Sequence, residues 1–124
     1  MDHKQVEQII NIHVHMGEEE HGVTARSLAL LPSWLPDIPE PTYIYLAYVT
    51  EPSWDFWTYV ANAAGFAVRF GGFSWGYGGE GCKGLHELIK ALGFRQPKNE
   101  PPPHTPGIWR LSRRGNLKCI KAGE

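Results

Sequence analysis

The sequence predicts an α+β fold: a single compact domain with a small, mainly antiparallel sheet and two to three short helices. The chain has 124 residues, 42% of them apolar, which is enough for one core and too few for two. Residues 42–49 are mostly β-branched and aromatic, as is typical of a strand. Two short apolar runs near the C-terminus, separated by a turn that contains Gly115, predict a hairpin. We therefore expect one domain over residues 1–124.

The N-terminal part allows two interpretations. Alternation of apolar and polar residues over 8–16 predicts a strand, and a helix over 4–14 is the competing interpretation. Leucines within 23–31 predict a short helix that Pro32 ends. Four prolines within 32–41 then predict an extended loop.

A helix is predicted after the strand at 42–49. Ser53 offers an N-cap, apolar side chains fall at helical spacing over 54–64, and Gly65 supplies a stop. Residues 66–70 are rich in aromatic and apolar side chains and predict a second strand.

The C-terminal half continues with a helix and the hairpin. Leucine and isoleucine at helical spacing predict a helix over 85–92 that ends at Gly93. A proline-rich linker over 95–107 follows, and 108–111 and 117–120 are the expected strands of the hairpin.

Charge and composition exclude several classes of protein. A net charge of −1 argues against a surface that embraces a long nucleic acid, although a local basic patch could still bind a phosphate-bearing small molecule. No apolar run has the roughly 20 residues of a membrane span, and the N-terminus lacks a secretory signal, so we expect a cytoplasmic protein with no membrane partner. Cys82 and Cys119 are then expected to be reduced thiols.

A glycine-rich loop over 71–84 is the most unusual segment. It holds half of the chain's 14 glycines and lies between a predicted strand and a predicted helix. Free backbone amides and the helix dipole at such a place attract phosphate, so the loop predicts a site for a small anionic ligand, a nucleotide. Alternatively, the glycines only let two aromatic segments turn, with Trp75 and Tyr77 as core residues.

Two nucleotide-binding folds are excluded. Gly76–Gly81 has the G-x-G-x-x-G spacing, but about 20 residues further on, where a Rossmann fold places an acid on a second strand, the chain has Glu100 before three prolines. A Walker A loop is excluded because Lys83 is followed by Gly84 rather than by serine or threonine.

The candidate ligand-binding residues combine this loop with cationic and aromatic side chains. Arginine and lysine can grip phosphate, and aromatic rings can stack on a base, although each residue taken singly could be solvated surface or core. The candidates are Arg69, Trp75, Gly76, Tyr77, Gly78, Gly79, Gly81, Lys83, Trp109, Arg110 and Arg113.

The sequence offers weak candidates for a catalytic or a metal site. Cys82 at a helix start could be a nucleophile with His86 or His104 as its base. His13 and His15 form an H-x-H pair that could bind a metal together with His21, but such a pair alone is a weak motif. We expect no catalytic residue, no metal and no cofactor.

The segment Phe73–Leu85 resembles the W-G-Y-G-G-x-G-P-x-x-L signature of small proteins carried by phages and mobile elements, with Cys82 where that signature has proline. By analogy, the chain is similar to the phage anti-defence sponges of the Thoeris anti-defence type. The resemblance implies a homo-oligomer, in the host cytoplasm if phage-encoded, that sequesters a cyclic nucleotide or cyclic ADP-ribose signal without cleaving it. A hydrolase of such a signal, or a protein-binding inhibitor module, is the alternative.

Overall fold

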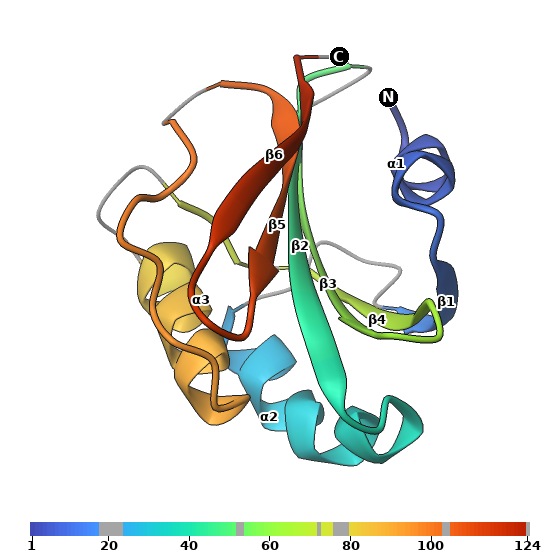
Figure 1. Ribbon diagram of the computed structural model, residues 1–124, viewed down its shortest axis with the longest axis vertical. Coiled ribbons are helices and arrows are strands. Elements are labelled where there is room, and N and C mark those ends of the chain that lie inside the picture. Colours follow the sequence, from blue (N-terminus) through green and yellow to red (C-terminus); the bar gives the residue numbers. More distant parts are fainter. Residues whose placement is uncertain (18–23, 52–53, 72, 76–79, 103–104, 124) are drawn as a thin grey trace.

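The computed structural model describes residues 1–17, 24–51, 54–71, 73–75, 80–102 and 105–123. It has the predicted α+β architecture, with one six-stranded sheet (Figure 1). The helices are α1 (His3–Ile10), α2 (Thr24–Trp34), the short 3-10 helix η1 (Leu35–Asp37) and α3 (Glu80–Ala91). The strands are β1 (His13–Gly17), β2 (Pro41–Val49), β3 (Asp55–Asn62), β4 (Phe66–Phe70), β5 (Gly107–Ser112) and β6 (Leu117–Ala122).

The sheet has the order β1-β4-β3-β2-β5-β6, and only its edge pair β1–β4 is parallel. The other pairs are antiparallel, so the sheet is mixed and mainly antiparallel, as predicted, but with six strands it is larger than the small sheet expected. Strand β2 lies at the centre and pairs with β3 on one side and with β5 on the other. The C-terminal hairpin therefore extends the sheet on the side opposite to β1.

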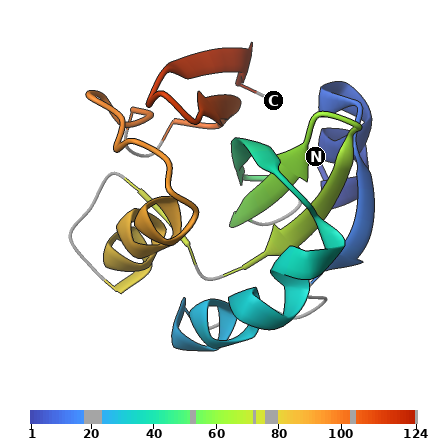
Figure 2. The same cartoon turned by 60° about the horizontal axis from the view of Figure 1, so that its bottom comes forward.

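Helices cover both faces of the sheet. Figures 1 and 2 show α2 and α3 on one side and α1 on the other. The larger core, which includes Trp75 and Trp109, lies between the sheet, α2 and α3. A smaller core packs Val6 and Ile10 of α1 against Tyr45, Tyr59 and other sheet residues. In Figure 1, α1 lies toward the β1–β4 edge, away from the hairpin of β5 and β6.

The N-terminal segment contains both of the competing elements, one after the other. Helix α1 begins after Asp2, whose carboxylate accepts from the Gln5 amide at 2.9 Å while the Gln5 side chain accepts from the Asp2 amide at 2.8 Å, a capping box. The helix ends at Asn11, which has a left-handed φ of 53°. The prediction of a strand over all of 8–16 is therefore wrong, and a strand forms only from His13.

The predicted helix over 54–64 is wrong, because this segment is strand β3. Phe56 and Val60 face the larger core, while Tyr59 and Ala61 face the smaller one. A strand that is buried on both faces carries apolar residues at every position, so helical spacing and strand spacing both fit its sequence. Gly65 belongs to the turn into β4, with a φ of +87°.

Other boundaries differ less from the prediction. Pro32 lies inside α2 rather than ending it, and η1 follows where an extended loop was expected. The helix predicted at 85–92 exists but begins five residues earlier, at Glu80. The hairpin is confirmed, and Gly115 in its turn has the positive φ, +83°, that the prediction required.

Candidate functional site

The centre of the glycine loop lies outside the described residues. The predicted ligand-binding residues Gly76, Tyr77, Gly78 and Gly79 are in that part, so their role stays a prediction. Gly81 and Lys83 belong to the first turn of α3, and the Lys83 side chain is exposed. The Ser74 amide donates to the Gly81 carbonyl at 3.3 Å, which ties the entry of the loop to the start of the helix.

The two tryptophans proposed for base stacking are core residues. Trp75 is 1% exposed, and its ring lies 4.8 Å from Phe56 and 5.9 Å from Trp109 in edge-on contacts. Trp109 is 6% exposed in the same cluster. Both rings are therefore already packed against aromatic neighbours, as the alternative interpretation of Trp75 expected.

Strand alternation separates Trp109 from Arg110. Successive residues of β5 point to opposite faces of the sheet, so Trp109 enters the larger core and Arg110 projects on the α1 side. Arg69 on β4 also lies on the α1 side, next to Val68 of the larger core. The structure thus does not bring the predicted arginines and tryptophans together in one site.

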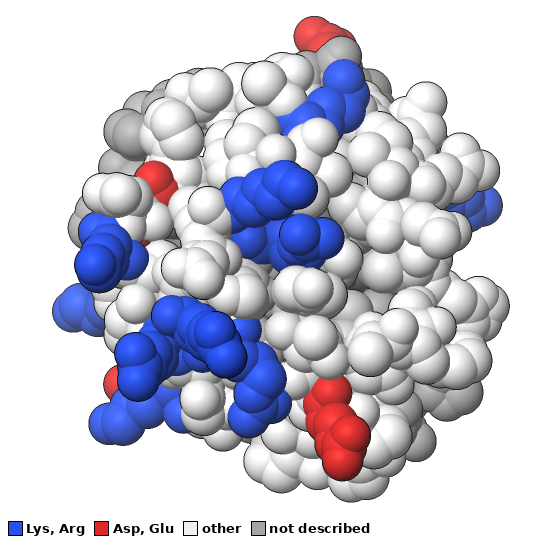
Figure 3. Space-filling model, viewed as in Figure 1, with Lys and Arg blue, Asp and Glu red and all other residues white. Residues whose placement is uncertain are grey.

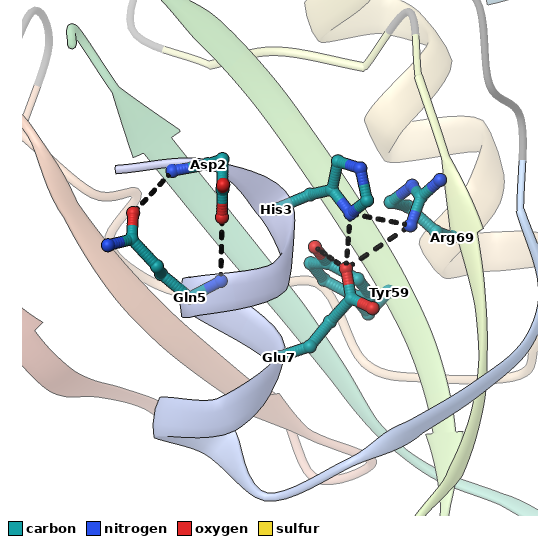
Figure 4. A network of polar contacts seen from close by, with 6 residues as sticks. All are labelled: Asp2, His3, Gln5, Glu7, Tyr59 and Arg69. Atoms are coloured by element: carbon teal, nitrogen blue, oxygen red, sulfur yellow. Dashed lines mark hydrogen bonds and ion pairs between the residues drawn. The ribbon is translucent and has the colours of Figure 1, made fainter. Parts of the chain in front are cut away.

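Arg69 is a buried structural residue. It is 5% exposed, and its Nη1 donates to Glu7 Oε2 at 3.2 Å and lies 3.1 Å from His3 Nδ1. Glu7 Oε2 also lies 3.0 Å from His3 Nδ1 and accepts from the Tyr59 hydroxyl at 3.1 Å (Figure 4). This network fastens α1 onto β3 and β4.

The polar contacts of Glu7 converge on one carboxylate oxygen. Glu7 Oε2 accepts both the Arg69 and the Tyr59 hydrogen bonds, which occupies the lone pairs of that oxygen. Burial, and then the charge of Glu7, raise the pKa of Tyr59 far above its ordinary value. Tyr59 therefore stays protonated and cannot act as an anionic nucleophile near neutral pH.

Arg110 has a different environment. Its guanidinium carbon lies 4.5 Å from the centre of the Tyr43 ring, a cation–π contact, and the residue is half-buried. In the sheet register Arg110 lies directly opposite Tyr45 of β2 and Lys118 of β6. In the part of the chain that the structure describes, neither Arg110 nor Lys118 forms an ion pair.

A bulge brings a further lysine to this surface. The register of β5 and β6 shifts between Ile108 and Trp109, so that Ile108 lies opposite Lys121 instead of Ile120. Directly opposite residues share a face of the sheet, so Lys121 joins Arg110 and Lys118. We define the hairpin face as seven side chains on this side of β2, β5 and β6: Tyr43, Tyr45, Ile108, Arg110, Lys118, Ile120 and Lys121. Of these, Tyr45 and Ile108 are buried in the smaller core and form the floor of the face.

Charge is distributed unevenly along the chain. Residues 95–123 hold seven of its 12 lysines and arginines and a single acidic residue, Glu100. In Figure 3 lysine and arginine side chains gather over the C-terminal hairpin and its turn, with few acidic side chains in view. The net charge of −1 therefore conceals a basic hairpin that an acidic remainder balances.

Helix α1 adds a groove on the same side of the sheet. Met1, Gln5, Gln8 and Ile9 line an open depression of about 490 Å³. The Met1 amino group donates to the Glu51 carbonyl just beyond β2, and Ile9 is 41% exposed. The groove offers two side-chain amides and two apolar side chains.

Arg113 and the candidate catalytic residues have local partners. Arg113 donates to the Pro41 carbonyl at 2.7 Å and lies 5.2 Å from the Phe94 ring, so it anchors the hairpin turn. His86 Nε2 pairs with Glu100 Oε1 at 2.7 Å, whereas Cys82 Sγ lies 3.9 Å from Ser74 Oγ. Cys82 and Cys119 are both free thiols, and His104 lies outside the described residues.

The predicted histidine pair can be followed at one position. His13 is exposed at the start of β1, and its ring lies edge-on to Phe66 at 6.0 Å. The side chain of His15 and all of His21 lie outside the described part. Among the described residues, histidine, cysteine and acidic side chains form no group of three or more that could hold a metal ion.

Sequence analysis missed the residues that surround Arg110. Tyr43 and Tyr45 were assigned to a strand without a role, and Lys118 and Lys121 were not considered. The uneven charge of 95–123 was a signal available in the sequence. The pairing of β2 with β5 and the bulge in β6 could not be predicted from the sequence, because the segments between these strands do not fix their register.

Within its described segments the chain has no helix that is long and apolar enough to cross a bilayer. Comparison with known proteins finds no family model, no curated protein and no solved structure that matches this chain. The assignment of a function therefore depends on the side chains described above.

Proposed function

We propose that the protein binds a nucleotide-like anion on the hairpin face and holds it without cleaving it. One observation carries the proposal: Arg110 lies over the Tyr43 ring and directly opposite Lys118. Like charges placed opposite each other across two strands destabilise a sheet. A bound anion removes this repulsion, because both cations then share its charge.

The Arg110 guanidinium supplies two kinds of contact. Its N–H groups can donate to phosphate oxygens in a fork, and its outer planar surface can stack on a base while Tyr43 supports the inner surface. Lys118 adds a mobile point charge, since its side chain is exposed. This set suits a phosphate joined to a flat ring.

Retention without cleavage follows from the types of side chain on this face. Its members are tyrosines, isoleucines, lysines and an arginine, as defined above. Hydrolysis of a phosphate ester requires a nucleophile or a water activated by a base or a metal. The described residues of the hairpin face supply neither a histidine nor a carboxylate for that purpose.

Calorimetric titration with cyclic AMP, ADP and cyclic ADP-ribose tests the proposal. At least one of them is expected to bind, and ligand released by heat after prolonged incubation is expected to be chemically intact. Altered ligand would favour the alternative of a nucleotide hydrolase. No binding of any of the three nucleotides would contradict the proposal, and a protein-binding inhibitor module would then be the remaining alternative.

A further inference from the structure

We infer that the natural ligand of the hairpin face is single-stranded nucleic acid, so that the nucleotide of the proposed function is one unit of a longer strand. The inference rests on the proposed function and extends it. It depends on the spacing of the basic side chains, on the Arg110–Tyr43 stack and on the groove beside α1.

The cations form a row rather than a point. Lys118 and Lys121 lie three positions apart on β6, about 10 Å at 3.3 Å per residue. Arg114, in the turn that precedes β6, adds an exposed third cation near Lys118. The phosphate of a single nucleotide engages only one part of such a row. A nucleic-acid strand carries one negative charge per nucleotide and can therefore neutralise the whole row.

The row lacks the carboxylates that usually accompany surface lysines and arginines. Arg110, Arg114, Lys118 and Lys121 form no ion pair in the described part of the chain. Glu100, the only acid within 95–123, pairs with His86 of α3 instead. The charge of the hairpin is therefore available to an external polyanion.

Stacking favours a single strand over a duplex. The Arg110 guanidinium carbon lies over the Tyr43 ring, 4.5 Å from its centre, which places an aromatic and a guanidinium group together on this face. Single-strand binders use aromatic and arginine side chains of this kind to stack on unpaired bases. In a duplex the bases stack on one another and cannot reach such a surface.

The groove along α1 is suited to a neighbouring base. The Gln8 side chain forms no hydrogen bond within the described part of the chain, and the Gln5 side-chain amide uses its oxygen in the capping box, which leaves its NH₂ group to donate. Ile9 and Met1 supply apolar surface for the flat side of a base. Because α1 and the hairpin face lie on the same side of the sheet, a strand can contact both.

The test is a binding series with fluorescently labelled oligothymidylates. Affinity is expected to rise at least tenfold from a mononucleotide to a strand of about eight nucleotides, within the range of site sizes of single-strand binders. The logarithm of the binding constant is expected to fall with the logarithm of salt concentration by about 0.7 per phosphate contact. A duplex of the same length is expected to bind more weakly.

Two double variants test where on the protein the nucleic-acid strand binds. Lys118→Gln with Lys121→Gln is expected to weaken the octanucleotide by about tenfold and to reduce the salt slope by more than one unit, since each lost phosphate contact contributes about 0.7. Lys90→Gln with Lys98→Gln removes the same charge from exposed positions on α3 and on the segment that follows it, and is expected to leave binding unchanged. Equal losses in both pairs would show a nonspecific charge effect and would overturn the inference.

Other outcomes separate this inference from the proposed function. Mononucleotide binding without any gain from length would overturn the inference and leave the proposed function standing. Equal affinity for a duplex, or for a poly-glutamate peptide of the same charge, would also overturn the inference. Loss of all nucleotide binding would overturn both.

Discussion

Two arginines on the same side of the sheet have opposite environments. Arg69, under α1, is 5% exposed and is bonded to Glu7 beside His3 and Tyr59. Arg110, on β5, is half-buried, lies over the Tyr43 ring and faces another cation. A buried charge needs a fixed partner inside the fold, and an open charge can take its partner from outside. The comparison identifies Arg69 as an arginine that holds the fold, whereas Arg110 is the one that we propose holds a ligand.

We call the surroundings of Arg69 the closed region and those of Arg110 the open region. The closed region should lose more stability than the open region when a charged partner is removed. Glu7→Ala leaves the buried Arg69 without its carboxylate, and breaking such a pair costs about 3–5 kcal/mol in free energy of unfolding. Urea denaturation of the purified variant measures this loss. Glu87→Ala, at an exposed position of α3, is the control and should change stability by less than about 0.5 kcal/mol. Equal stability of the two variants would show that the Glu7 network does not hold α1.

The open region should lose binding and keep its stability. Arg110→Ala is expected to weaken nucleotide binding by about 1–3 kcal/mol, the usual worth of one stacking contact, because both the fork of donors and the stacking plane disappear. Calorimetric titration with the tightest ligand of the wild type measures this change. Arg114→Ala, an exposed arginine in the turn, should lose less affinity. A large loss of stability in Arg110→Ala would show that Arg110, like Arg69, stabilises the fold.

The Tyr59 hydroxyl provides a pH test of the closed region. Because burial raises the pKa of Tyr59, the folded chain keeps a proton that the unfolded chain loses above the ordinary value of about 10. The free energy of unfolding should therefore fall as pH rises above about 10, with this residue adding up to about 1.4 kcal/mol per pH unit. Tyr59→Phe should cost about 1 kcal/mol at neutral pH through the lost hydrogen bond to Glu7, and should make that fall shallower. Identical slopes for both proteins would contradict a buried, neutral Tyr59.

The smallest expected effect has opposite signs for stability and for binding. Lys118→Gln removes the like charge opposite Arg110 and should stabilise the free protein by about 0.2–1 kcal/mol at low salt, while nucleotide binding becomes weaker. Thermal denaturation and titration of the same sample compare the two quantities. Lower stability together with unchanged affinity would show that Lys118 neither repels Arg110 in the free protein nor contributes to ligand binding.

Sequence patterns predicted local features well and contacts between distant segments poorly. The hairpin and its Gly115 were predictable because turn chemistry is local. Strand β3 was mistaken for a helix because burial on both faces removes the alternation that marks a strand. The predicted site combined Trp109 and Arg110, which are adjacent in the sequence. Adjacent residues of a strand point in opposite directions, so the two side chains lie on opposite faces of the sheet. The Glu7–Arg69 pair joins residues too far apart in the chain for any local pattern to predict.

A nuclear magnetic resonance titration of the ¹⁵N-labelled protein with the tightest-binding nucleotide tests the central claim most directly. Binding on the hairpin face predicts the largest amide shifts on β2, β5 and β6, near Tyr43, Arg110 and Lys118, with small shifts around Arg69. Shifts confined to the glycine-rich loop over 71–84 and the start of α3, with the hairpin unchanged, would contradict it.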